Sequence, residues 1–271
     1  MKYNNFYFIL FKHPMKSFCW KIGRWLHHRN NEKSKIIYRK LMVNQTYNWF
    51  HLRERRCLTV TLYKSILIGL LGSFLMFLGD MILYYDSNDY DGQDTINNII
   101  GIMKNVSIKR LYLGGLLGPI CAFIYCIGFY HIVLATQEKY LNVAWFVFLI
   151  NIFGMILGGT YHIQCAYLGL LSRHENKGAF DEFLKFLKFQ AKIVFGILAL
   201  ANIALALIIL FGFTVFPSWQ TLFTPIFLLI FTPLAERLPK GQHMIIRGGW
   251  FNIIYFIYYL TLLIQYNNVN L

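Results

Sequence analysis

Three long stretches of this 271-residue chain contain no Asp, Glu, Lys or Arg, and they constrain its fold more than any other feature. They are Leu111 to Gln137, Tyr140 to Ser172, and the 43 residues from Ile193 to Ala235. A hydrocarbon core about 30 Å thick is crossed by roughly 20 apolar residues in a helix, so each stretch holds a span and the last holds two. Charged residues make up only 14% of the chain, against about 25% in soluble domains. A water-soluble fold is therefore excluded.

Hydropathy predicts an all-α, polytopic integral membrane helix bundle with about six transmembrane helices. The expected spans are residues 60–85, 111–135, 143–171, 193–216, 220–235 and 246–265. The fifth is short and contains Pro225 and Pro233, which favours a tilted, kinked or re-entrant segment. Between the third and fourth spans, apolar side chains recur at helical spacing among charged ones over residues 180–188. This pattern predicts one interfacial amphipathic helix there.

Charge divides the chain into two predicted domains, residues 1–58 and 59–271. The first is a basic tail that contains aromatic residues, and it holds 13 of the 26 Lys and Arg residues of the chain. Such a tail is expected to lie on an anionic membrane surface or to stay solvated, peripheral to the functional unit. Because no nucleic-acid-binding motif accompanies it, no specific nucleic-acid partner is expected. The second domain is the six-span membrane domain.

Basic residues in the loops predict the orientation of this membrane domain. The odd-numbered loops share one face of the membrane, which we call the odd-loop face, and they carry 11 Lys and Arg residues. The opposite face, without the tail, carries only Lys64 and Lys139. The positive-inside rule therefore favours odd-numbered loops in the cytoplasm, whereas the tail by itself favours the reverse.

Polar side chains within the spans are the candidate functional residues, because an ionisable group there costs about 2.5 to 3.5 kcal/mol to insert. Asp80 lies about one turn before the end of the first span, and His162 lies in the third. Steps of three and four residues place a whole stripe on the same helix face as His162. The stripe is Asn151, Gly154, Gly158, His162, Cys165 and Gly169. Antiparallel threading gathers the candidate ligand-binding or proton-site residues near the odd-loop face: Asp80, Arg110, His162, Glu236, Arg247 and Asn252.

This clustering predicts a one-sided polar cavity that binds or moves a small molecule, an ion or a lipid headgroup. Asp80 is the expected charge partner or proton site, His162 the titrating or hydrogen-bonding group, and Arg110 the counter-ion or anion contact. One alternative is an intramembrane enzyme acting on a lipid or other apolar substrate, with Asp80 and His162 as an acid–base pair or as metal ligands completed by Glu236 or His243. Another is an accessory subunit, in which the glycines are packing seams and the arginines are snorkelling residues.

No motif points to a metal or a cofactor. The five cysteines include no CxxC pair, and the sequence has no GxSxG, Walker, HExxH or GxGxxG motif. The acidic residues 86–94 lack two ligands of a calcium-binding loop. His131, beside Tyr130 at a span end, is expected to be an interface residue. No cofactor and no catalytic residue are therefore predicted.

Four segments resemble a group of bacterial multi-pass membrane proteins known only as a domain of unknown function. They are residues 78–85 (LGDMILYY), 110–119 (RLYLGGLLGP), 128–131 (GFYH) and 158–162 (GGTYH). The resemblance covers about residue 60 to the C-terminus and implies a six-span α-helical protein in the bacterial plasma (inner) membrane. The lipid bilayer is thus the expected partner, with a small-molecule or lipid ligand, and nothing in the pattern predicts the oligomeric state.

Overall fold

Helices account for nearly all of the secondary structure in the described part of the chain. The computed structural model describes residues 61–86, 95–174, 177–235, 237–238 and 240–269, with no description of the side chains of 95–98, 240–247 and 268–269. These residues belong to the unit Thr59–Leu271, and the predicted basic tail, residues 1–58, lies outside them. Within them, the one extended pairing is an isolated bridge between Thr136 and Thr214. The predicted all-α fold class is confirmed.

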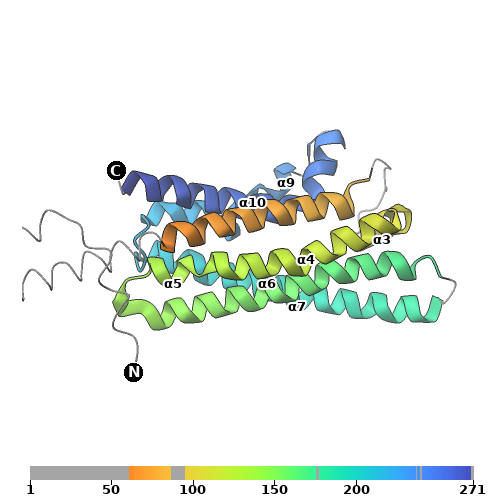
Figure 1. Cartoon of the computed structure of the whole chain (residues 1–271), viewed down its shortest axis with the longest axis horizontal. Helices are drawn as coiled ribbons and strands as arrows, with labels where there is room; N and C mark the ends of the chain where they lie inside the picture. The colour runs from red at the N-terminus through yellow and green to blue at the C-terminus, as the bar shows by residue number, and fades with distance from the viewer. Residues whose placement is uncertain (1–60, 87–94, 175–176, 236, 239, 270–271) are drawn as a thin grey trace, which may run out of the picture. The chain divides into compact units, whose positions relative to one another are not determined.

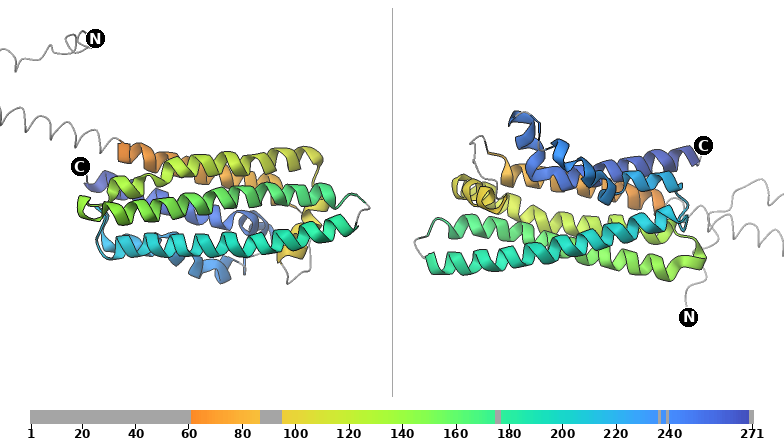
Figure 2. Two further views of the ribbon diagram at one scale, coloured as in Figure 1. Left: turned by 90° about the horizontal axis from the view of Figure 1, so that it is seen from below. Right: turned by 180° about the vertical axis from the view of Figure 1, so that it is seen from behind.

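Five of the described helices are long and apolar enough to cross a membrane. They are Thr61–Tyr84, Ile108–Ala135, Glu138–Leu171, Lys177–Leu210 and Gly248–Asn267. Figure 1 shows the first in orange and labels the others α4 (Ile108–Phe129) with α5 (His131–Ala135), α6 (Leu141–Leu171), α7 (Lys177–Leu210) and α10 (Lys240–Val269). The two further views in Figure 2 agree that these helices run alongside one another. The predicted polytopic membrane helix bundle is therefore confirmed.

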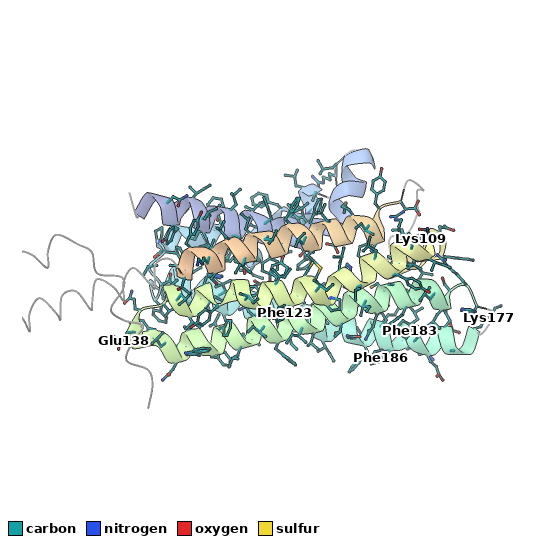
Figure 3. The ribbon with its side chains drawn as sticks, in the orientation of Figure 1. Lys109, Phe123, Glu138, Lys177, Phe183 and Phe186 are labelled. Atoms are coloured by element: carbon teal, nitrogen blue, oxygen red, sulfur yellow. The ribbon has the colours of Figure 1, made fainter. Side chains whose placement is uncertain are left out.

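The outer surface of the bundle is apolar between two polar ends. Phe123 and Phe146 are 68% and 63% exposed on this surface, which suits acyl chains and would be unfavourable in water. Figure 3 shows Glu138 at one end of the bundle and Lys109 and Lys177 at the other. The second end contains the predicted odd-numbered loops, and we call it the odd-loop end.

Close helix packing at small residues holds the core together. An added Cβ at Gly128 of α4 would lie 2.4 Å from the Gly69 Cα, so the two backbones touch there. Ser65 strengthens the same crossing, because its hydroxyl donates to the Gly128 carbonyl oxygen at 2.9 Å. Between α4 and α6, Gly115 faces Ala166 in the same close manner, since an added Cβ would lie 2.7 Å from the alanine Cβ. Several of the glycines are thus packing positions.

The fifth predicted span is not a long helix. Residues 218–235 form four short pieces: η2 (Ser218–Phe223), α8 (Pro225–Leu228), η3 (Leu229–Phe231) and α9 (Thr232–Ala235). Thr224 has extended backbone angles, φ −69° and ψ 152°, because the following Pro225 excludes the helical region for the residue before it. Five of the six predicted spans are therefore long helices, and the remaining one is broken by proline, as its sequence had indicated.

The predicted interfacial helix between the third and fourth spans is not a separate element. Residues 180–188 form the first turns of α7, which continues to Leu210 over 34 residues. No proline interrupts this run, and its Leu, Ala, Lys, Glu and Phe residues favour one uninterrupted helix. Loop one also contains a helix that hydropathy did not predict, α3 (Thr95–Asn105), which packs on α6. Of the acidic segment 86–94, only Asp86 lies within the described residues.

Candidate functional site

Asp80 and His162 meet in the interior of the bundle near the odd-loop end. Asp80 comes from the last turns of the Thr61–Tyr84 helix and His162 from α6, and their side chains approach to 3.3 Å between Oδ1 and Nδ1. The two residues are only 4% and 5% exposed. Glycine makes room for the imidazole: a Cβ added at Gly118 of α4 would lie 2.7 to 2.9 Å from three His162 carbon atoms. The glycine-rich start of α4 therefore forms the niche that seats the histidine.

The hydrogen bonds of the pair leave one proton with two available positions. His162 Nε2 lies 2.9 Å from the carbonyl oxygen of Gly114, and a carbonyl only accepts, so this nitrogen carries a hydrogen. Between Asp80 Oδ1 and His162 Nδ1 there is then one further proton, which belongs either to the carboxyl or to the imidazole. A neutral pair and an ion pair have the same total charge of zero. The site thus carries no net charge into the membrane in either form.

Asn252 of α10 holds the second carboxylate oxygen. Its Nδ2 donates to Asp80 Oδ2 at 2.5 Å, and its Oδ1 accepts from the hydroxyl of Tyr125 at 2.9 Å. These donor and acceptor roles agree with those of the Asp80–His162 contact. The proton of Asp80, when present, is on Oδ1, so Oδ2 is free to accept from Asn252. We call Asp80, His162, Asn252 and Tyr125 the polar cluster. It joins the Thr61–Tyr84 helix to α4, α6 and α10.

Aromatic and thiol side chains surround the polar cluster. The ring of Tyr84 lies edge-on to the His162 imidazole, with 5.7 Å between centroids. Tyr84 and Tyr161 both pack against the buried cluster that contains Cys165, about one turn beyond His162 on α6. Cys165 belongs to the predicted stripe, of which Gly158 is the only member that is not buried. The stripe therefore faces the protein, as its polarity requires.

Arg110, the predicted counter-ion, is turned away from the polar cluster. Its Nε donates to the carbonyl oxygen of Ile82 at 2.8 Å and its Nη2 donates to that of Tyr85, at the C-terminal end of the Thr61–Tyr84 helix. A cation there satisfies carbonyl groups that have no partner within the helix and opposes the negative end of the helix dipole. Arg173 does the same for α3, since it donates to the carbonyl oxygens of Met103 and Val106. Both arginines are thus helix caps in this structure.

Two further candidates cannot be placed in the site. Glu236 lies outside the described residues, and Arg247 lies in α10 without a described side chain, as does His243. Among the side chains that are described, no group of three His, Cys, Asp or Glu residues is arranged to hold a metal ion. Of the six candidates, the structure therefore brings together Asp80, His162 and Asn252.

His131 is a buried residue that the sequence placed at the interface. It is 1% exposed, its Nδ1 lies 2.8 Å from the Gly128 carbonyl oxygen, and its Nε2 lies 2.8 Å from the Tyr258 hydroxyl. One feature of the sequence could have indicated a buried polar partner for His131. The spacing of Asn252, Tyr255 and Tyr259 places polar groups on one face of α10, with Tyr258 beside them. Tyr255, Tyr258 and Tyr259 are all buried.

The polar cluster lies at the odd-loop edge of the hydrocarbon layer, not at its centre. His162 is 21 residues beyond Leu141, the first residue of α6 after the charged Glu138 and Lys139. At the helical rise this is about 32 Å, close to the full thickness of about 30 Å of a hydrocarbon core. The cluster therefore lies closer to the odd-loop face than to the opposite face.

The fold and the site together define an all-α, multi-helix integral membrane protein with a buried carboxylate–imidazole pair. The chain belongs to the family of unknown function DUF6796, whose model matches residues 42–269. No curated protein and no solved structure matches the chain. The resemblance to a domain of unknown function is thus confirmed, and the match begins at Met42, within the tail that the resemblance had left outside.

Proposed function

We propose that this protein binds a small cation at Asp80 in exchange for the proton that Asp80 shares with His162. The cation is an inorganic ion or an amine, either free or carried by a lipid headgroup. The observation that carries the proposal is the 3.3 Å carboxylate–imidazole contact inside an apolar bundle. A carboxylate in this position is costly unless it is paired, and such groups in membrane helices commonly mark ion and proton sites.

Charge balance supports an exchange of one proton for one monovalent cation. With the shared proton present, Asp80 and His162 together have no net charge. When a monovalent cation binds the Asp80 carboxylate and that proton leaves, His162 stays neutral and the total charge is again zero. The net charge of the site is therefore the same before and after the exchange. A divalent cation would leave one uncompensated charge.

The position of the cluster supports binding from one side of the membrane. It lies at the odd-loop edge of the hydrocarbon layer, where water, ions and lipid headgroups are all within reach. Because Asp80 and His162 are almost completely buried, ligand entry requires a local opening. The short helices η2 to α9 lack the continuous hydrogen bonding of a long helix, and α9 contacts α10 near Asn252 through the bond from Trp250 to Thr232. This segment is therefore the element best suited to move.

The imidazole geometry favours ion binding over catalysis. A histidine that acts as a general base presents one ring nitrogen to its substrate while a carboxylate orients the other. In His162 the second nitrogen is already bonded to the Gly114 carbonyl oxygen at 2.9 Å. No ring nitrogen is left for a substrate, so an acid–base mechanism is less well supported than a cation site.

Proton release is the direct test of the proposal. Full-length protein in dodecyl maltoside, in weak buffer with a pH indicator, is mixed with sodium, potassium, ammonium or ethanolamine chloride, and with N-methylglucamine chloride as an inert cation. We expect one proton per protein to be released by at least one of the four probes, together with a higher melting temperature. Nanodiscs of phosphatidylethanolamine or phosphatidylcholine then distinguish a lipid-borne amine from a free one.

Asp80→Asn is the informative variant, because it keeps the shape of the side chain and removes the exchangeable proton. It should release no proton, whereas Glu138→Gln, which alters an exposed carboxylate at the opposite end, should behave as the native protein. His162→Gln provides a second variant of the pair. The proposal fails if none of the four probes releases a proton, or if Asp80→Asn releases as much as the native protein.

A further inference from the structure

The first part of α7 has an outward face of unusual composition. Leu187, Ala191, Val194 and Leu198 are buried toward the bundle. Lys185, Phe189 and Lys192 follow one another at steps of four and three residues on the opposite side, and all three are exposed. Phe189 is 62% exposed although it is large and apolar. We call these three residues, with Lys188 beside them, the α7 basic face.

The exposed residues of α7 change in kind at Ile193. From there to the end of the helix, the large exposed side chains are all apolar: Ile193, Phe195, Leu200, Ile203, Leu207 and Leu210. Ile193 and Leu210 are separated by about 26 Å along the helix axis, which is close to the thickness of a hydrocarbon core. Lys192 therefore marks the edge of the hydrocarbon layer at the odd-loop end.

Most of the α7 basic face falls at the level of the headgroup layer on this account, and Lys185 lies on the aqueous side of that layer. Phe189 lies about 6 Å and Lys185 about 12 Å beyond Ile193 along the helix, and the headgroup layer is about 5 to 7 Å thick on each side. Helical side chains point toward the N-terminus of their helix, which here is away from the bilayer centre. The ammonium groups of Lys188 and Lys192 can thus reach lipid phosphates, and the Phe189 ring lies at the level of the headgroups, just outside the acyl chains.

The lysines of this face form no ion pair with the described side chains. The nearest acids on the same side of α7 are Asp181 and Glu182, one turn before Lys185. Arg110 and Arg173, at the same end, already have partners within the protein, because both donate to helix carbonyl oxygens. We propose that the α7 basic face binds the headgroups of anionic phospholipids, such as phosphatidylglycerol, in the leaflet at the odd-loop end.

The chemistry of the face favours lipid over a protein partner. Its apolar part consists of Phe189 with Phe186 at the margin, which is small for a protein interface, where an apolar centre is surrounded by a polar rim. Three cations around one aromatic ring match the headgroup layer, where lipid phosphates are the available anions. The proposal is independent of the cation site at Asp80, and either can fail without the other.

Lipid-dependent melting of the full-length protein tests this inference. Dioleoyl phosphatidylglycerol and dioleoyl phosphatidylcholine are titrated separately into protein in dodecyl maltoside, and the melting temperature is followed. We expect stabilisation at lower concentrations of phosphatidylglycerol than of phosphatidylcholine, and loss of the difference in high salt. Each lysine near an anionic surface contributes about a fivefold preference, so the triple variant K185Q/K188Q/K192Q should bind phosphatidylglycerol about one hundred-fold more weakly.

Two further variants make the result decisive. K185R/K188R/K192R keeps the charge and should retain the preference, and K64Q/K139Q removes lysines at the opposite end and should retain it also. Equal stabilisation of the native protein by both lipids would overturn the inference. So would an unchanged preference in K185Q/K188Q/K192Q, or loss of the preference in K64Q/K139Q alone. Stabilisation by a soluble acidic polypeptide but not by phosphatidylglycerol would assign the face to a protein partner instead.

Discussion

Two buried histidines, one in each half of the bundle, have the same first partner and different second partners. His162 Nε2 contacts the carbonyl oxygen of Gly114 at 2.9 Å, and His131 Nδ1 contacts that of Gly128 at 2.8 Å. The second nitrogen of His162 meets the carboxyl group of Asp80, whereas that of His131 meets the hydroxyl of Tyr258.

The second partner decides which chemistry the imidazole can perform. The Tyr258 hydroxyl donates to a bare nitrogen of His131, so every proton of that pair has a fixed position and the site is neutral and structural. The Asp80–His162 pair contains a proton with two available positions and a group that is an anion once the proton leaves. Both histidines are therefore buried, and they differ in their second partner. Only the carboxyl group beside His162 provides a proton that a cation could replace.

Removal of His162 should have the largest effect. His162→Leu leaves the Asp80 carboxyl group buried with only Asn252 beside it, and breaking a buried pair in this way costs about 3 to 5 kcal/mol. His131→Leu removes hydrogen bonds between neutral groups and should cost about 1 to 3 kcal/mol. Equilibrium unfolding in mixed micelles measures both values.

A double variant sharpens the same contrast. Asp80→Leu combined with His162→Leu removes both polar partners, and it should be more stable than His162→Leu alone because no unpaired charge remains. If His162→Leu and His131→Leu were equally destabilising, the distinction between the two sites would be lost.

Filling the niche of His162 should have the next largest effect. Gly118→Ala places a methyl group within 2.7 to 2.9 Å of three imidazole-side-chain carbons, and overpacking of this kind costs about 1 to 3 kcal/mol. The variant should also weaken proton release, because the imidazole moves from Asp80. Gly158→Ala is the matched control: its added methyl group meets nothing within 4 Å, so it should be neutral or slightly stabilising.

Loss of the Tyr258 hydroxyl should be a smaller change. Tyr258→Phe deprives His131 Nε2 of its donor at 2.8 Å, which should lower the free energy of unfolding by about 1 to 2 kcal/mol. Proton release at Asp80 should be unaffected, and the indicator assay checks this. A loss of proton release in this variant would show that the two halves of the bundle are coupled.

Tyr259→Phe should have the smallest effect, of the opposite sign. The Tyr259 hydroxyl is buried and has no hydrogen-bond partner in the part of the chain that the structure describes. Its removal relieves an uncompensated polar group and should raise the free energy of unfolding by up to about 1 kcal/mol. Destabilisation instead would mean that a water molecule or another residue bonds to this hydroxyl in the membrane.

Particular residues show how far sequence patterns reach. The cost of charge inside a span marks Asp80 and His162 as candidates, and antiparallel threading predicts that they lie near one face. The structure brings the two into contact with each other, and Asn252 from a third helix bonds to Asp80. Arg110 was selected by the same rule and serves as a helix cap. The local sequence cannot separate these roles, because an arginine near a span end reaches carboxylates and carbonyl oxygens equally well.

The charge-free stretches and the prolines determined the class of fold before any coordinates, because hydrocarbon excludes unpaired charge and proline excludes an unbroken helix. The partners of each imidazole were decided only by tertiary packing. Gly118 and Gly128 let neighbouring helices approach within contact distance, and that approach sets which side chain from the Thr61–Tyr84 helix or α10 faces each histidine. Those contacts join residues more than 100 positions apart for Tyr258 and His131, a separation that no local pattern spans.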